Sequence, residues 1–402
     1  MLDSHGYHDE WSRFNQLIAA GAHRKLVLHS PEMAFEQLEA FVNEAKLPVI
    51  FILSYDLKNA VEQLTSSNND ICQCPYLIAI EPLIVYFTKN GQQHILKQKG
   101  VDVTLTIEDS LDQLKYEEYP TKQDAKPFAH MDESSYMQHF QKIKDHIQRG
   151  DIYEMNYCIS FKRENTPINP IQTYCNLSAQ SPAPFSAYFK HENMHVICSS
   201  PERFLHKKGN ILTSQPIKGT AKRHIYEVED KLAKQGLLES EKERNENVMI
   251  VDLVRNDLSR LAQKAGVFVE ELYGVYSFAK VHQMISTIQA KLKKDATFSD
   301  ILYATFPMGS MTGAPKINAM KFAEEFEDFK RGFYSGSIGY VWPGGDFDMN
   351  VVIRSLVYNL DLKSAYIGAG SAITSLAEAQ AEYKECLLKA EAIINAIVYD
   401  TE

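Results

Sequence analysis

The order of strand-like and helical segments constrains the fold of this chain more than any other feature of its sequence. Strand-like runs follow one another at irregular intervals, and several of them are joined only by short turns. Parallel strands need a long crossover connection, usually a helix, whereas antiparallel strands can be joined by a tight turn. We therefore expect an α+β fold with largely antiparallel sheets.

Residue patterns predict where the individual segments lie. Helices are expected over 34–44, 135–149, 228–265, 315–329 and 375–398. Strands are expected over 47–53, 76–80, 83–87, 153–162, 186–198, 206–215, 333–341, 349–360 and 364–369. The charged, apolar-poor segment 115–126 is typical of a linker or surface loop, which predicts an N-terminal subdomain over 1–125 and a larger domain over 126–402.

The composition excludes several classes of protein. The 402 residues are 45% hydrophobic and 23% charged, as in soluble globular proteins. A formal net charge of −10 argues against nucleic-acid binding, and the longest apolar run, 47–53, is too short to span a membrane. The first ten residues are too polar for a signal peptide, and six scattered cysteines form no disulfide framework, so we expect a cytoplasmic protein with reduced thiols.

One lysine is a candidate nucleophile. It stands in the pentapeptide Pro216-Ile-Lys-Gly-Thr220, where a strand-like run enters a turn. An amine attacks carbon only when it is unprotonated, and burial among apolar neighbours is a common way to lower the pKa of a lysine. The alternative to a nucleophile is an ordinary solvated lysine in a turn, and this motif alone does not exclude it.

Two expected helices carry carboxylates on one face. Glu243 and Glu246 are three residues apart, and Glu378, Glu382 and Glu385 follow at i, i+4 and i+7. Each stripe alone is typical of a solvated helix face. If the two helices faced one another, however, the carboxylates would offer the hard oxygen ligands that Mg²⁺ prefers.

Two glycine-containing segments are candidate anion sites. Residues 306–316 place a Gly- and Ser/Thr-rich turn before a helix, so that free backbone N–H groups point away from the helix start. Residues 366–371 lie between a strand and the last expected helix, where glycines allow close approach of the backbone to a carboxylate. Either segment could also be a turn without a ligand.

Taken together, these segments resemble the chorismate-utilising enzymes, a family that includes the large subunits of anthranilate synthase and aminodeoxychorismate synthase and the isochorismate and salicylate synthases. The resemblance covers roughly residues 135 to 392, and the N-terminal part matches more loosely through Ile52-Leu-Ser-Tyr-Asp56. Six blocks carry it, in order: Gly150-Asp-Ile-Tyr-Glu-Met-Asn156, Ser200-Pro-Glu-Arg203, Pro216-Ile-Lys-Gly-Thr220, Lys242-Glu-Arg-Asn-Glu-Asn-Val-Met-Ile-Val-Asp-Leu-Val-Arg-Asn-Asp-Leu258, Gly309-Ser-Met-Thr-Gly-Ala-Pro-Lys316, and Gly368-Ala-Gly370 with Glu382-Tyr-Lys-Glu-Cys-Leu-Leu-Lys389.

The resemblance implies a four-layer α/β/β/α sandwich with two facing, largely antiparallel sheets, as in anthranilate synthase component I. Within the family, the block around Lys218 resembles aminodeoxychorismate synthase component I, because anthranilate synthase normally has alanine there. The lysine that isochorismate and salicylate synthases carry in the block 150–156 is missing here. An anthranilate synthase component and a non-catalytic chorismate-binding protein remain as alternatives.

The resemblance also implies roles for individual residues. Lys218 would attack ring carbon 2 of chorismate, and Glu202 would protonate the departing 4-hydroxyl as a general acid. Mg²⁺ would be the cofactor, held by four glutamates: Glu246 and Glu385 directly, and Glu243 and Glu382 through its waters.

Substrate carboxylate would be bound by Tyr334, Arg354 and the backbone of Gly368, Ala369 and Gly370. Thr312 and His282 would line the same cavity, although a histidine satisfied within the core is the alternative for His282. None of the six cysteines stands in the Gly-rich elbow of a glutaminase. The resemblance therefore implies that ammonia comes from a separate glutamine amidotransferase subunit.

Overall fold

The strands form two large sheets in which every pairing is antiparallel. The structure, a computed structural model, describes residues 1–7, 11–101 and 127–400. The first sheet has 11 strands, in the order β17 (Gly313–Ala314), β9 (Glu154–Arg163), β21 (Ser364–Ile373), β20 (Ser355–Asn359), β11 (Met194–Ser200), β10 (Phe185–His191), β1 (Leu2–Asp3), β2 (Gln16–Ala20), β6 (Ile84–Lys89) and β7 (Gln92–Lys97), with β8 (Ala129–His130) also on β9.

The second sheet has 10 strands. Their order is β14 (Ile217–Lys222), β16 (Val281–Leu292), β13 (Ile211–Gln215), β12 (Arg203–Lys208), β19 (Phe347–Asn350), β18 (Ser337–Val341), β4 (Val49–Leu53), β5 (Leu77–Glu81) and β3 (Arg24–Leu28), with β15 (Ala262–Ser277) also on β16.

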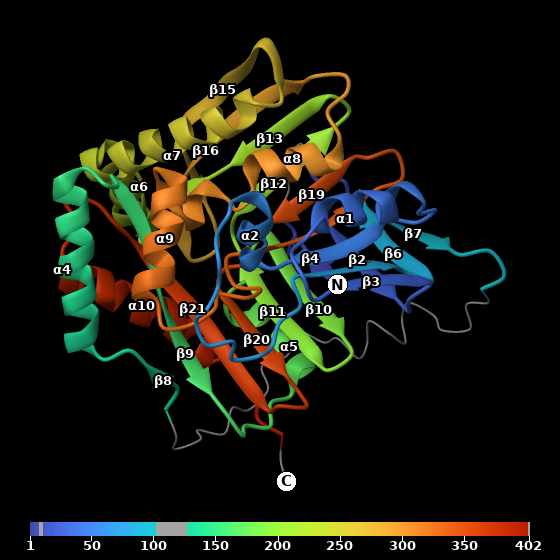
Figure 1. Cartoon of the computed structure of the whole chain (residues 1–402), viewed down its shortest axis with the longest axis horizontal. Coiled ribbons are helices and arrows are strands. Elements are labelled where there is room, and N and C mark those ends of the chain that lie inside the picture. Colours follow the sequence, from blue (N-terminus) through green and yellow to red (C-terminus); the bar gives the residue numbers. More distant parts are fainter. Residues whose placement is uncertain (8–10, 102–126, 401–402) are drawn as a thin grey trace.

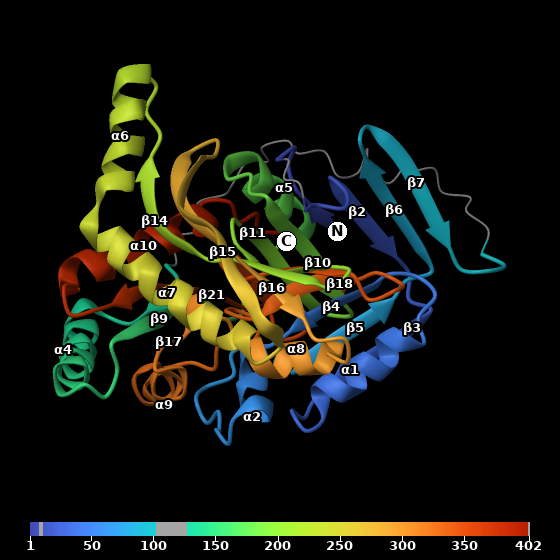
Figure 2. The ribbon, with the colours of Figure 1, turned by 90° about the horizontal axis from the view of Figure 1, so that it is seen from above.

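Helices pack against strands of both sheets (Figures 1 and 2). On the first sheet lie α4 (Glu133–Arg149), α5 (Pro170–Gln180), α9 (Lys316–Phe326) and α10 (Ala379–Ile394). On the second lie α1 (Ala34–Asn43), α6 (Glu227–Glu239), α7 (Glu241–Ser259) and α8 (Phe298–Thr305), and a short α2 (Lys58–Val61) follows β4. The expected α+β sandwich with helices outside two antiparallel sheets is confirmed.

Strand alternation decides which side chains face the space between the sheets. In β9, Met155, Tyr157 and Ile159 belong to the apolar core beneath α4 and α10, whereas Cys158 belongs to the other core cluster. Successive side chains of a strand point to opposite faces. Glu154 and Asn156, at even positions like Cys158, therefore point away from the helices and toward the second sheet.

The N-terminal segment contributes strands to both sheets. Strand β1 pairs with β10 in the first sheet, and β4 pairs with β18 in the second. The N-terminal strands β2, β3, β4, β6 and β7 lie in the right half of Figure 1, in blue to cyan. The expected boundary between residues 125 and 126 touches the range 102–126, which lies outside the described residues, so the division into 1–125 and 126–402 stays a prediction.

Some expected elements differ from the structure. The helix expected over 228–265 is α6 and α7, divided at Ser240, and its last residues belong to β15. Ser240 accepts a hydrogen bond from the Glu243 N–H as the N-cap of α7, which starts a new helix there. The strand expected over 364–369 is confirmed as part of β21, which extends to Ile373, so the glycine segment 366–371 lies inside a strand and not in a turn after it. None of the described helices is long and apolar enough to cross a membrane.

Candidate functional site

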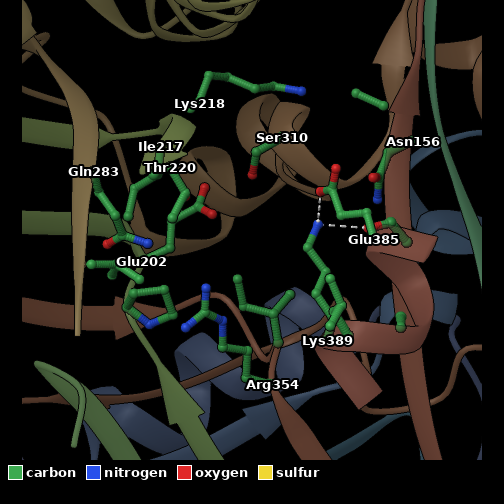
Figure 3. Close-up of a pocket in the computed structure, with 18 of the residues that line it drawn as sticks. Asn156, Glu202, Ile217, Lys218, Thr220, Gln283, Ser310, Arg354, Glu385 and Lys389 are labelled. Atoms are coloured by element: carbon green, nitrogen blue, oxygen red, sulfur yellow. Dashed lines mark hydrogen bonds and ion pairs between the residues drawn. The ribbon is translucent and has the colours of Figure 1, made fainter. Parts of the chain in front are cut away.

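A cavity of about 590 Å³ is lined by residues of both sheets and of α7 and α10. Strand β14 contributes Ile217 to Thr220, β21 contributes Gly368 to Gly370, and β9 contributes Asn156. Figure 3 shows Asn156, Lys218 and Thr220 around one open space. Its size suits a small organic molecule.

Lys218 lies at this cavity and is only 8% exposed. Its Nζ forms an ion pair of 2.5 Å with Oε1 of Glu154, a buried side chain of β9. Burial lowers the pKa of Lys218, but the carboxylates of Glu154, Glu246 and Glu202 together raise it above its ordinary value. Lys218 is therefore an ammonium in this arrangement, and burial alone does not make it a free amine.

Glu202 is buried in the wall of the same cavity, directly before β12. Burial raises the pKa of this carboxyl to about 7, although Ser310 and the Lys218 ammonium both act to lower it. Glu202 can therefore carry a proton near neutral pH, as a general acid must.

All four glutamates predicted to bind metal line the cavity, two from α7 and two from α10. Glu246 lies on the buried stripe of α7 with Ile250 and Val254, four and eight residues further on. Glu382 lies on the buried stripe of α10, four residues before Cys386. Packing of these two helices against different sheets thus brings carboxylates that are far apart in sequence to one space.

Lysines 242 and 389 supply positive charge beside these carboxylates. Lys242 Nζ lies 3.6 Å from Oε1 of Glu382 and 3.9 Å from Oε1 of Glu246. Lys389 Nζ lies 2.6 Å from Oε1 of Glu385 and donates a hydrogen bond of 2.8 Å to the carbonyl oxygen of Gly370. Burial lowers the pKa of Lys242, and all four glutamates outweigh that effect and raise it.

The residues present fit a magnesium ion. Oε1 of Glu246 is buried without a hydrogen-bond partner, and burial raises the pKa of its carboxyl to about 7. Among the described residues no three His, Cys, Asp or Glu side chains are grouped closely enough to enclose a metal by themselves. Mg²⁺ keeps several waters and needs only one or two protein carboxylates together with an anionic substrate.

The backbone of β21 presents an open edge to the cavity. Its register with β20 ends at Ile367, whereas its pairing with β9 continues to Ile373. A Cβ on Gly368 would lie 2.2 Å from Cδ1 of Tyr334, and one on Gly370 would lie 2.5 Å from Sγ of Cys158. Only glycine fits these two positions, which keeps backbone groups accessible beside the Tyr334 ring.

Arg354 lies on the opposite side of this space from Lys218 in Figure 3. Its guanidinium lines the cavity and is half-buried. Burial lowers the pKa of Arg354, and Glu385 only partly offsets this effect. A partly desolvated guanidinium favours pairing with an incoming carboxylate.

Two predicted substrate residues do not line the cavity. His282 points toward α6, where its ring interacts with Ser277 Oγ at 2.9 Å and with Asp230 Oδ1 at 3.1 Å. Its neighbours Val281 and Gln283 line the cavity instead, because side chains alternate along β16. The hydroxyl of Thr312 donates within its own turn, to the carbonyl oxygens of Met308 and Gly309. His282 is therefore a histidine whose hydrogen bonds are satisfied within the core, which is the alternative interpretation of this residue.

The structure adds two polar residues that the sequence analysis missed. Gln283 is 2% exposed, lines the cavity beside Glu202 and Thr220, and its Oε1 has no hydrogen-bond partner (Figure 3). Glu154 pairs with Lys218. Each is a polar residue within a largely buried strand. Because a buried polar group needs a partner, this pattern could have identified both as candidate site residues.

Comparison with known proteins identifies the family of this chain. The sequence matches the chorismate binding enzyme family over residues 5–395. It is 33% identical to aminodeoxychorismate synthase component 1 of Bacillus subtilis (strain 168) over 369 residues, which is 88% of this chain and 77% of that protein. It is 43% identical over 260 residues to a probable chloroplastic aminodeoxychorismate synthase of Oryza sativa subsp. japonica, which covers 64% of this chain but only 29% of the rice protein.

The fold is likewise similar to a solved structure. Anthranilate synthase component I from Streptococcus pneumoniae TIGR4 superposes with a TM-score of 0.79 at 26% identity, covering 96% of this chain and 93% of that one. The family match and the shared fold extend over nearly all of the chain, and the Bacillus relative covers 88% of it. This protein belongs to the chorismate binding enzyme family.

Proposed function

We propose that this chain is aminodeoxychorismate synthase component I, which converts chorismate and ammonia to 4-amino-4-deoxychorismate for the synthesis of para-aminobenzoate and folate. One observation carries the proposal above all: a buried lysine, Lys218, lies in the same cavity as the carboxyl of Glu202. The names of the Bacillus and rice relatives support the same activity.

The first chemical task is to remove the 4-hydroxyl of chorismate. Hydroxide is a poor leaving group, so the oxygen must be protonated as its bond to carbon 4 breaks. Glu202 would supply this proton and become a carboxylate, and the 4-hydroxyl would depart as water. The pKa of about 7 that burial gives Glu202 suits a general acid at neutral pH.

The second task is covalent. Lys218 would lose its proton to the Glu154 carboxylate within hydrogen-bonding distance, and its neutral amine would attack ring carbon 2 as both conjugated ring double bonds shift and water leaves carbon 4. Ammonia would then add to carbon 4 and release a proton. The two double bonds would shift back, and the bond from carbon 2 to Lys218 would break, which returns the free amine.

Binding of the substrate would rest on opposite charges. Glu246 and Glu385 would hold Mg²⁺, with Glu243 and Glu382 bound to its waters, and the ion would supply positive charge for the ring carboxylate. Arg354 would pair with a carboxylate, and Tyr334 and the open edge of β21 would complete that pocket. The unpartnered Oε1 of Glu246 supports the metal assignment.

Ammonia would come from a separate glutamine amidotransferase. All six cysteines of this chain are buried, and none lies in a Gly-rich nucleophile elbow. A glutaminase needs a thiolate that its substrate can reach, so the hydrolysis of glutamine is assigned to a partner protein.

Anthranilate synthase component I is the second candidate, and the fold shared with the Streptococcus pneumoniae protein favours it. The two functions are separated by incubating the purified chain with chorismate, ammonium and Mg²⁺ and identifying the product by mass spectrometry. Our proposal requires aminodeoxychorismate, with pyruvate still attached to the ring. Formation of fluorescent anthranilate without an added lyase would contradict it, and a chain that binds chorismate without turnover would be a binding protein.

A further inference from the structure

Lys242 of α7 forms ion pairs with predicted metal ligands on both α7 and α10. It lies one turn before Glu246, so these two side chains share one face of the helix. Its Nζ reaches across to α10, 3.6 Å from Glu382 and 3.9 Å from Glu246. One ammonium therefore lies between carboxylates of two helices that are assigned to one ion.

The contacts of this ammonium are loose. Both exceed hydrogen-bonding distance, and 45% of the Lys242 side-chain surface is exposed, whereas Glu246 and Glu382 are buried. Oε1 of Glu246 is left without a hydrogen-bond partner although the Lys242 ammonium lies 3.9 Å from it. A long, exposed side chain held in this way can swing into solvent at little cost.

We propose that Lys242 is a resident counter-cation of the carboxylate cluster, which Mg²⁺ must displace in order to bind. The proposal rests on the proposed function, since that assigns the metal to these glutamates. The ammonium and the ion cannot both lie among the same oxygens, because like charges repel at such distances. Lys242 thus stabilises the buried carboxylates before metal binds, and it weakens metal binding by the same interaction.

The displaced ammonium has a second consequence. A divalent ion replaces one positive charge by two, whereas a sodium or potassium ion replaces one charge by one and gains nothing in charge. Lys242 therefore competes with monovalent cations as well as with the divalent ion, and it keeps monovalent ions out of the site. A neutral residue at 242 removes this competitor, so potassium begins to occupy the carboxylates and to compete with the divalent ion.

The test measures metal binding rather than activity. Purified full-length protein, freed of metal by chelation, is titrated with Mn²⁺, and free Mn²⁺ is counted by electron paramagnetic resonance, with Mg²⁺ as competitor. Lys242→Gln is compared with wild type, with Lys242→Arg, which keeps the charge, and with Lys384→Gln. Lys384 is an exposed lysine of α10, the helix that carries Glu382 and Glu385. Its substitution therefore removes an equal charge from the neighbourhood of the cluster.

We expect Lys242→Gln to bind Mn²⁺ about three- to tenfold more tightly, because the ion pairs that are lost are loose and exposed. Lys242→Arg and Lys384→Gln should stay close to wild type. Metal-free Lys242→Gln should also unfold at a lower temperature than wild type, and Mg²⁺ should raise its unfolding temperature by the larger amount. In Lys242→Gln, KCl should weaken Mn²⁺ binding more than choline chloride at equal ionic strength does. In wild type, the two salts should have similar effects.

Other results would overturn the proposal. Equal tightening in Lys242→Gln and Lys384→Gln would mean that only net charge matters. Unchanged or weaker Mn²⁺ binding in Lys242→Gln would mean that Lys242 does not compete with the metal, while the metal assignment itself would stand. Failure of every variant to bind Mn²⁺ would overturn both this proposal and the metal part of the proposed function.

Discussion

Lys218 of β14 and Glu154 of β9 form a buried ion pair of 2.5 Å that joins the two sheets across the cavity. The pair fixes the lysine amine at a defined place in a space that Glu202 also lines. It also keeps the lysine protonated, since the carboxylates raise its pKa despite burial. The side chain proposed as nucleophile is therefore well placed but must lose a proton before it can react.

Replacement of Glu154 by Gln should lower the pKa of Lys218, because it removes the carboxylate that most strongly favours the ammonium and leaves burial, which favours the amine. The pH dependence of reductive methylation at Lys218, followed by peptide mass spectrometry, measures this pKa. The labelling midpoint should move to lower pH in Glu154→Gln and should not move in the control Glu164→Gln. An unchanged midpoint would mean that the ion pair does not control the lysine.

Replacement of Lys218 by Ala should abolish the covalent adduct with the substrate. Chorismate should still bind, because binding is assigned to the metal, Arg354 and the backbone of β21. Denaturing mass spectrometry of enzyme quenched during turnover would detect the adduct, and calorimetry would measure binding. Residual turnover by direct attack of ammonia is compatible with the mechanism, whereas full aminodeoxychorismate formation by Lys218→Ala would refute it.

Catalysis should decline as pH rises through about 7, because burial raises the pKa of Glu202 to that value and the acid form is the one that donates a proton. Glu202→Gln should lower kcat by about 10²- to 10⁴-fold and remove this decline. The measurement is kcat against pH at a fixed concentration of free NH₃. Retention of the decline in Glu202→Gln would assign it to another group.

Replacement of Glu246 by Gln should raise the Mg²⁺ concentration needed for half-maximal activity by about 10- to 100-fold. It should also stabilise the metal-free protein. Burial raises the folded-state pKa of Glu246 from 4.5 to about 7. Ionisation of Glu246 therefore destabilises the folded protein, and this loss of stability begins near pH 4.5 and is complete above pH 7. Thermal unfolding at pH 5 and pH 8 checks the sign, with Glu241→Gln at an exposed position of α7 as the control.

Replacement of Gly368 by Ala should destabilise the fold by about 1–3 kcal/mol and raise the KM for chorismate, because the new methyl group would strike the Tyr334 ring. Gly236→Ala is the matched control. No heavy atom lies within 4 Å of a Cβ at that position in α6, so alanine should stabilise the helix by about 1 kcal/mol. Urea unfolding and steady-state kinetics measure the two effects, and equal stability of Gly368→Ala and wild type would contradict the packing argument.

The sequence predicts the fold and most of the site, because short blocks with distinctive residues carry them. Lys218, Glu202 and the four glutamates all line one cavity, as expected from those blocks. The side of a strand to which each side chain points is harder to predict. The family resemblance implies that His282 lines the cavity, but β16 turns it toward α6 and brings Gln283 to the cavity, since a shift of one residue exchanges the two faces of a strand.

Local patterns also failed where tertiary contacts decide the structure. Residues 262–265 were expected to continue a helix, yet they begin β15, whose pairing with β16 overrides local helical preference. The strand expected over 364–369 continues to Ile373, so Gly370, which the glycine pattern favours for a turn, lies within β21, where Cys158 packs closely against it. Such contacts join residues distant in sequence, so no local pattern reveals them.

The pairing of β4 with β18 has a consequence for how the chain is made. A ribosome completes Val49–Leu53 when most of the protein does not yet exist, and the partner strand Ser337–Val341 is among the last segments to be synthesised. Strand β5 can pair with one edge of β4 early, but the backbone N–H and C=O groups of the other edge stay unpaired until β18 is made. The unpaired edge of a strand with five apolar side chains favours aggregation, so we expect this segment to need protection during synthesis.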